Sequence, residues 1–267
     1  MLIAQISDCH IVEPARLFGD EVDSAAGLRA AIGAIGALDR RPDVVLATGD
    51  LVNDGTSAQY DHLEEILGGL DIPVIPVAGN HDDRTELRRR FDGVVPPGEP
   101  ADPTCFTIDD HDVRLVILDT TIPGRHDGRV GSGQLEWLDE QLGSAPERPT
   151  IVVQHHPPFV TGLRWMDAHC GFADGDAEAV VLARHTHVEG VVCGHLHRSI
   201  QRRFANTIAM VCPSTAAPLD LDLGDGPVGY STEPTGLLLH EWRPAIGLTS
   251  HVVSIGRYRR WTPPWAG

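Results

Sequence analysis

Residues 43–50 read DVVLATGD, an apolar run that ends abruptly in a glycine and an aspartate. A short run of this kind is typical of a β-strand that is buried on both faces. Similar runs lie on either side of it, at residues 2–6 and 73–77. Residues 24–39 and 57–67, between these runs, carry apolar side chains at helical spacing. This β-α-β-α-β order predicts parallel strands covered by helices.

The rest of the chain continues with short elements. We expect a hairpin from residues 104–109 and 113–118, helices over 134–142 and 177–184, and strands over 150–154 and 188–193. Four β-like runs follow at 200–204, 207–211, 236–241 and 248–254, with a Gly-, Pro- and Asp-rich loop over 213–234. The pattern shows no repeat or linker. It therefore predicts a single domain over residues 1–267, a two-sheet α/β sandwich in which the segment from about residue 199 to 267 completes the second sheet.

Composition excludes several classes of function. The 267 residues include 21 basic and 38 acidic side chains, a formal net charge of −17. Such a charge argues against a protein that wraps long nucleic acid, which needs a basic face. Every basic residue is arginine, so a P-loop, which needs a lysine, is excluded.

The cysteines and apolar segments indicate a cytoplasmic protein. Five scattered cysteines without a C-x-x-C pair favour reduced thiols over a disulfide framework or zinc ribbon; they are Cys9, Cys105, Cys170, Cys193 and Cys212. The first residues lack the basic and apolar regions of a signal peptide. No window approaches the ~18 apolar residues of a membrane span.

Polar side chains follow five of the predicted strands, at the point where each strand ends. These clusters are Asp8 and His10, Gly49-Asp50, Gly79-Asn80-His81-Asp82, His155-His156, and Gly194-His195-Leu196-His197. Because ligands of open α/β sheets bind beyond the carboxyl ends of the strands, we expect these side chains to converge. Glycine at the turns permits positive φ and close backbone approach. The His-x-His spacing predicts both imidazoles on one side of an extended segment.

The convergent set is chemically specific. Two aspartates, one asparagine and four histidines supply oxygen and imidazole ligands without thiolate, a mixture that suits Mn, Fe, Co or Zn. Seven ligands exceed the needs of one ion and fit two ions that share a bridging carboxylate. Such a pair is a clamp for in-line displacement at phosphorus.

The ordered pattern D-x-H, G-D, G-N-H-D, H and G-H-x-H, from Asp8 to His197, resembles the calcineurin-like metallophosphoesterase superfamily. Serine/threonine protein phosphatases carry an Asp-Arg pair after the second motif, which this sequence lacks. The short chain and the motifs at 79–83 and 155–158 look like class III cyclic-nucleotide phosphodiesterases and equally like bacterial glycerophosphodiesterases. The resemblance implies a four-layer α/β/β/α sandwich of two mixed sheets.

The resemblance also implies roles for individual residues. One metal would be held by Asp8, His10 and His197, the other by Asn80, His155 and His195, and Asp50 would bridge both. His81 would lie over the substrate and stabilise or protonate the leaving oxygen, so His81 and Asp50 are the catalytic candidates, and Asn80, His81 and His197 would contact substrate. His156 would either support a metal ligand without binding metal itself or be structural. Two divalent or trivalent ions would supply a hydroxide that attacks a small phosphodiester, in a homodimer or larger homo-oligomer formed through the C-terminal segment.

Two alternatives stay open: a phosphomonoesterase or nuclease of the same superfamily, and a non-catalytic metal-binding scaffold. Substrate choice is expected to lie in loops 160–175 and 213–234. His169 and Asn53 are candidates for the pocket and for a hydrogen bond near the bridging carboxylate. Candidate phosphate contacts are Arg125, Arg129 and Arg164. Histidines expected at the surface or in packing are His62, His126, His185, His187, His240 and His251.

Overall fold

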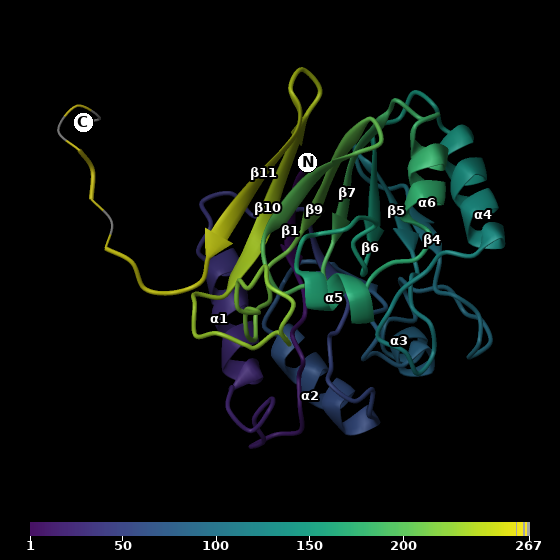
Figure 1. The fold of residues 1–267 in the computed structure, drawn as a ribbon. Coiled ribbons are helices and arrows are strands. Elements are labelled where there is room, and N and C mark those ends of the chain that lie inside the picture. Colours follow the sequence, from purple (N-terminus) through teal and green to yellow (C-terminus); the bar gives the residue numbers. More distant parts are fainter. Residues whose placement is uncertain (260, 264, 266–267) are drawn as a thin grey trace.

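The computed structural model describes residues 1–259, 261–263 and 265, and it forms two β-sheets that pack face to face (Figure 1). The first sheet has the strand order β11-β10-β1-β2-β3. Its strands are β1 (Leu2–Ile6), β2 (Val44–Thr48), β3 (Val74–Val77), β10 (Gly236–Arg243) and β11 (Gly247–Ser254). Strands β1, β2 and β3 run parallel, whereas β10 and β11 are antiparallel additions beside β1.

The second sheet has the order β4-β5-β6-β7-β9-β8. Its strands are β4 (Phe106–Ile108), β5 (Arg114–Leu118), β6 (Thr150–Gln154), β7 (Val188–Cys193), β8 (Ile200–Phe204) and β9 (Thr207–Val211). Strands β5, β6, β7 and β9 are parallel, and the edge strands β4 and β8 are antiparallel.

Helices cover the outer face of each sheet. Helices α1 (Ser24–Gly36) and α2 (Ser57–Leu67) pack on the first sheet, and α4 (Ser132–Gly143) and α6 (Gly175–Leu182) pack on the second. Two shorter helices, α3 (Arg84–Arg90) and α5 (Arg164–His169), follow β3 and β6. None of the helices in the described part of the chain combines the length and hydrophobicity needed to cross a bilayer.

Alternation along the strands divides the core into three apolar layers. In β2, Val45 and Ala47 pack against α1 and α2, whereas Val44 and Leu46 face the second sheet. In β5, Val116 packs against the opposite helical layer, while its neighbours face the first sheet. Three apolar interfaces separate four layers, so the predicted α/β/β/α sandwich of two mixed sheets is confirmed.

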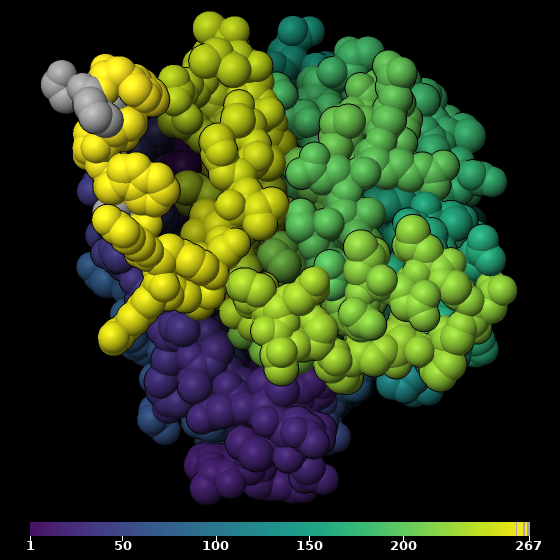
Figure 2. Space-filling model, turned by 60° about the vertical axis from the view of Figure 1, so that its left-hand side comes forward, coloured from purple at the N-terminus to yellow at the C-terminus, as the bar shows by residue number. Residues whose placement is uncertain are grey.

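The expected place of the C-terminal segment needs a correction. Strands β8 and β9 do extend the second sheet, but β10 and β11 join the first, where β10 pairs with β1 from Leu2↔Glu241 to Gln5↔Leu238. Strand β10 suits this place because Leu237 and Leu238 enter the two apolar layers on either side of the first sheet. The loop over 213–234 carries the chain from one sheet to the other and lies against the N-terminal segment (Figure 2).

Candidate metal centre and substrate cavity

The structure brings together all seven side chains predicted to hold metal. Each lies just beyond the carboxyl end of a parallel strand: β1 positions Asp8 and His10, β2 Asp50, β3 Asn80, β6 His155, and β7 His195 and His197. These five strands belong to two sheets whose carboxyl ends open on the same side of the molecule. Every one of the seven except Asn80 is buried.

Asp50 is at the centre of the cluster. One of its oxygens, Oδ2, lies 3.4 Å from Nε2 of His155 and 3.7 Å from Nε2 of His10. Asn80 Oδ1 is 3.2 Å from the same His155 nitrogen. Because Asp50 has imidazoles on two sides, its carboxylate is in a suitable position to bridge two ions.

Asp8 is the second carboxylate of the cluster. Its Oδ1 lies 3.6 Å from Nε2 of His197, and that nitrogen lies 3.1 Å from Nε2 of His10. Both Asp8 oxygens also accept the backbone N–H of His195 at 3.0 Å, which ties the end of β1 to the end of β7.

Left-handed backbone is concentrated in these residues. Five of them have φ between 42° and 73°: Asp8, His10, Asp50, His195 and His197. Positive φ is uncommon for non-glycine residues and clusters at functional sites. The expectation of an extended His-x-His segment is therefore wrong, because the chain turns at both histidines. The turn sends His197 toward Asp8, while His195 packs against His155, 5.1 Å between ring centroids.

Glycines permit the strand ends to approach closely. Gly49 has φ +90°, as expected for a sharp turn. A Cβ on Gly79 would lie 2.1 Å from the backbone nitrogen of Asp50, and one on Gly194 would lie 2.0 Å from Ser7 Oγ. The predicted close approach therefore explains glycine at Gly79 and Gly194, whereas the predicted positive φ holds at Gly49 but not at these two positions.

Hydrogen bonds on the far side of the imidazoles orient their ligating nitrogens. Nδ1 of His155 donates to the carbonyl of Thr48 at 2.9 Å, and Nδ1 of His197 donates to that of Ala217 at 2.7 Å. Nδ1 of His10 faces Asn53 Oδ1 at 3.3 Å, so Asn53 supports the cluster as expected. In each case Nδ1 carries a proton and Nε2 points into the cluster, the orientation found around metal-bound histidine.

These contacts test whether a cation fits. The Nε2 atoms of His10 and His197 face each other at 3.1 Å, and both rings carry their proton on the opposite nitrogen. Two lone pairs at this distance repel unless a positive charge lies between or beside them. Asp8 and Asp50 make the same demand, because they lie in one cluster and, among the described residues, their ion-pair partners are histidines and not arginines. The donor set therefore fits bound metal ions.

The electrostatics of the site agree with this conclusion. Burial lowers the pKa of His10 well below its usual value and that of His195 to about 3, so both rings are neutral at pH 7. Burial would also lower the pKa of His155, but attraction to Asp50 outweighs it and raises that pKa to about 9. Burial opposes ionisation of Asp50, yet His155 and its neighbours hold its pKa well below the usual range. The neutral rings of His10 and His195 and the ionised Asp50 are in the protonation states that metal binding requires, whereas His155 holds a second proton at pH 7 that a bound ion would displace.

His156 occupies a different position from its neighbour. Its Nδ1 lies 2.8 Å from the hydroxyl of Thr120, and its Nε2 lies 3.2 Å from the carbonyl of His126. Both ring nitrogens are engaged in hydrogen bonds, as suits a structural residue.

Asp82 has no role predicted from the sequence, although it is part of the Gly-Asn-His-Asp run. Its carboxylate accepts hydrogen bonds from the backbone N–H of Gly79 at 2.9 Å and of Leu51 at 3.2 Å, and from the hydroxyl of Tyr60 at 3.0 Å. Asp82 thus ties the loop of Asp50 to the loop of Asn80. The available signal was its place in the Gly-Asn-His-Asp run, directly after the candidates Asn80 and His81.

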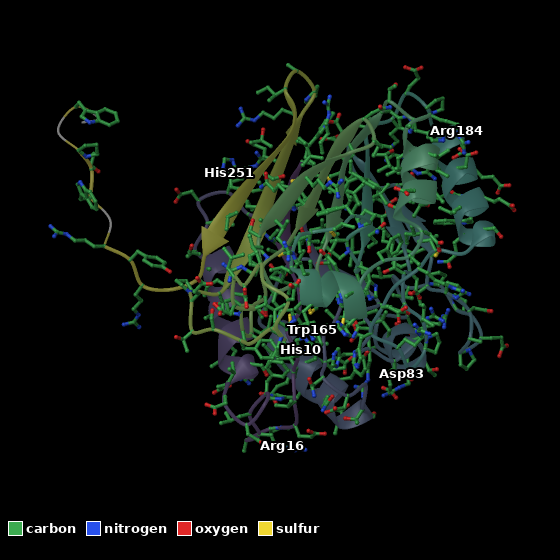
Figure 3. All side chains as sticks on the ribbon, viewed as in Figure 1. His10, Arg16, Asp83, Trp165, Arg184 and His251 are labelled. Atoms are coloured by element: carbon green, nitrogen blue, oxygen red, sulfur yellow. The ribbon has the colours of Figure 1, made fainter. Side chains whose placement is uncertain are left out.

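A cavity of about 290 Å³ opens on the cluster. His81 lines it, with its Nδ1 donating to the carbonyl of Asn53 at 2.7 Å. The two loops expected to set specificity supply the apolar walls, with Trp165, Met166 and Cys170 from one and Leu219, Val228 and Tyr230 from the other. Figure 3 shows His10 and Trp165 together beside this end of the sheets.

Several expectations about the cavity need correction. His126, expected at the surface or in packing, is exposed but lines the cavity. His169 does not; it stacks on Trp165 at 4.4 Å instead. The three arginines proposed for phosphate also lie outside the cavity wall, because Arg125 pairs with Asp127, Arg164 pairs with Asp225, and Arg129 is exposed.

The remaining histidines fulfil the expectation of surface or packing roles. His62 and His240 are buried and hydrogen-bonded, His185 pairs with Asp139, His187 is half-buried, and His251 is exposed. All five cysteines are free.

Comparison with known proteins identifies the family. Residues 1–199 match the calcineurin-like phosphoesterase family. The chain is 31% identical over 259 residues to the probable glycerophosphodiester phosphodiesterase GpdQ of Arcobacter nitrofigilis, covering 97% of this chain and 94% of that protein. It is 35% identical over 254 residues to a probable cyclic nucleotide phosphodiesterase of Synechococcus, covering 91% of both.

The fold has a counterpart among solved structures. A dimetal phosphatase from Danio rerio superimposes with a TM-score of 0.64 at 15% identity, covering 96% of this chain and 99% of that one. This likeness concerns the fold alone. The match over residues 1–199 and the identity to GpdQ show that the chain belongs to the calcineurin-like phosphoesterase family.

Proposed function

We propose that this protein is a phosphodiesterase that uses two metal ions to hydrolyse small phosphodiesters, either cyclic nucleotides or glycerophosphodiesters. The observation that carries the proposal is the position of Asp50, 3.4 Å from His155 and 3.7 Å from His10, at the base of a cavity. The relatives are named for hydrolysis of these two substrate classes.

The two sides of Asp50 supply the two proposed ligand sets. Asp8, His10 and His197 form one cluster of ligand atoms, which would hold the first ion. Asn80, His155 and His195 would hold the second, with Asp50 shared between them. Nitrogen and oxygen donors without thiolate suit manganese, iron, zinc or cobalt. When bound, the ions would lower the pKa of water toward neutrality and neutralise charge on the phosphoryl oxygens.

His81 would act on the leaving group. Its backbone N–H donates to Asp50 Oδ1 at 2.8 Å, and its Nδ1 donates to Asn53, so the ring is held with Nε2 free on the cavity side. In the imidazolium form, with a second proton on Nε2, the ring would donate a hydrogen bond or that proton to the leaving oxygen and return to the neutral form. Asn80 and His197, which also line the cavity, would contact the substrate beside it.

Activity with and without metal tests the proposal. Turnover of bis-p-nitrophenyl phosphate should appear with Mn²⁺ and disappear with EDTA. Asp50→Ala should abolish it, whereas Asp92→Ala, at an exposed position, should not. Absence of turnover with Mn²⁺, Fe²⁺, Zn²⁺ and Co²⁺ alike would favour a metal-binding scaffold. A panel of cyclic AMP, 2′,3′-cyclic AMP, glycerophosphoethanolamine and p-nitrophenyl phosphate would then identify the substrate class and expose a phosphomonoesterase.

The cellular setting of the proposed enzyme is the cytoplasm, supported by the five free cysteines. We also propose a homodimer or larger homo-oligomer. Support comes from the described residues after β11, which extend away from the two sheets (Figure 1) and include Trp261, 74% exposed, and Trp265, 86% exposed. Light scattering of the purified chain measures its oligomeric state directly.

A further inference from the structure

His126 lines the cavity and belongs to the loop between β5 and α4. No residue of this loop has a role in the proposed mechanism. The ring of His126 lies 5.4 Å from that of His81, tilted by 43°, so the two imidazoles face the same space. The cavity lining within the described residues contains no arginine. An anionic phosphodiester would therefore find no guanidinium there and would depend on the metal ions and on hydrogen-bond donors such as the imidazoles and Asn80.

The loop that carries His126 is fixed by buried residues. The backbone N–H of His156 donates to the hydroxyl of Thr120 at 3.2 Å, and that hydroxyl donates in turn to Nδ1 of the same ring at 2.8 Å. The proton of His156 is therefore on Nε2, which donates to the carbonyl of His126 at 3.2 Å. A Cβ on Gly128 would lie 2.4 Å from the His156 ring, so the loop packs against this histidine as closely as glycine allows. The exposed side chain of His126 is therefore attached to a backbone whose position is fixed by these contacts.

Asn80 determines which nitrogen of His126 carries the proton. Asn80 Oδ1 faces the metal cluster at His155, so its amide nitrogen is on the opposite side, 3.2 Å from Nδ1 of His126. An amide NH₂ group can only donate. Nδ1 of His126 therefore accepts, and the ring proton resides on Nε2. The adjacent His81 has the reverse arrangement, with its proton on Nδ1.

We propose that His126 is a second substrate-binding histidine, whose Nε2–H donates a hydrogen bond to a non-bridging oxygen of the phosphodiester. The inference rests on the proposed function, since it names a further contact for the same substrate. His156 is a positioning residue for this contact, and Asn80 serves both the metal cluster and the ring of His126.

The test compares His126→Phe, which keeps a ring without a donor, with His126→Gln, whose amide nitrogen replaces Nε2. In Mn²⁺-loaded protein, His126→Phe should raise KM for bis-p-nitrophenyl phosphate roughly 10- to 100-fold, the effect of one hydrogen bond to a charged group. The change should appear in KM more than in kcat, because the contact exists in the bound substrate as well as the transition state. His126→Gln should recover most of the loss. His251→Ala, a change on β11 far from the cavity (Figure 3), should leave KM unchanged.

Two measurements do not depend on turnover. Calorimetric titration of zinc-loaded protein with inorganic phosphate should show the same loss of affinity in His126→Phe. Nitrogen-15 spectra of the imidazoles should place the proton of His126 on Nε2, and a proton on Nδ1 would contradict the inference. Unchanged KM and phosphate affinity would overturn it, as would loss of metal in His126→Phe, which would make the ring a support for Asn80 only. If the wild type binds phosphate through His126 but hydrolyses no diester, the binding inference stands and the proposed function fails.

Discussion

Replacing Asp82 by asparagine probes the connection between the two loops that carry Asp50 and Asn80. The Asp82 carboxylate accepts from Gly79 N through one oxygen and from Leu51 N and the Tyr60 hydroxyl through the other. Asparagine keeps the shape but presents an NH₂ group to one of these two sides. At least one backbone N–H then faces a donor, whichever way the amide turns.

The size of the effect follows from this count. An unsatisfied N–H costs about 1–3 kcal/mol, and the remaining bonds each lose about 1 kcal/mol when their acceptor loses its charge. We therefore expect Asp82→Asn to lower the free energy of unfolding by about 2–4 kcal/mol. Because Asp82 holds the backbone of both ligand loops, metal affinity should fall by about 10- to 100-fold, as for other residues that orient ligands.

Two assays separate these effects. Urea unfolding in EDTA measures the stability of the metal-free chain, and calorimetric titration with Mn²⁺ measures metal affinity. Asp92→Asn, at an exposed position, is the matched control and should change neither quantity. Metal affinity of Asp82→Asn within twofold of the wild type would show that the two loops hold their places without this carboxylate.

Three further changes test other parts of the site and fold. Asp50→Ala should remove both metals in elemental analysis and lower kcat/KM by several orders of magnitude; retention of two ions would exclude the bridging role. His81→Ala should reduce turnover of alkyl phosphodiesters more than that of p-nitrophenyl esters, whose leaving group needs no proton, and equal losses would remove His81 from the acid role. Burial raises the pKa of Glu178 from 4.5 to about 8, so the wild type should lose stability as pH rises from 4.5 through 8. Glu178→Gln should be free of that loss in urea unfolding series in EDTA, and parallel pH profiles would show that Glu178 ionises normally.

The strands were predictable because each is a short apolar run closed by glycine or a polar motif. Strands β1, β6, β7, β8 and β9 have the bounds expected from the sequence. Helix α2 does as well, since its apolar spacing is clear and Thr56 caps it. Helices α3 and α5 were missed because seven and six residues are too short to show a helical period, and each buries a single side chain, Leu87 or Met166.

Contacts between residues far apart in the sequence were harder to predict. The short β-like run at 236–241 predicted β10 as a strand but not as the partner of β1, because that choice depends on which sheet edge remains open. The metal candidates were predictable since they directly follow strands. The left-handed turns at His195 and His197 were not, because the Asp8 carboxylate that holds the turn comes from the other end of the chain.

The cavity wall was predictable only as loops. Loops 160–175 and 213–234 do line the cavity. The sequence of these loops gave no indication that Trp165 and Tyr230 face the cavity, or that Arg164 pairs with Asp225 outside it. His126 was missed for the same reason. Its place depends on contacts with His156 and Asn80, which lie 30 and 46 residues away.

Anomalous diffraction from crystals grown with Mn²⁺ provides the most direct test of the metal centre. We expect two manganese peaks on either side of the Asp50 carboxylate, one against Asp8, His10 and His197 and the other against Asn80, His155 and His195. A single peak, or peaks that leave Asp50 without a metal contact, would contradict a shared two-ion site.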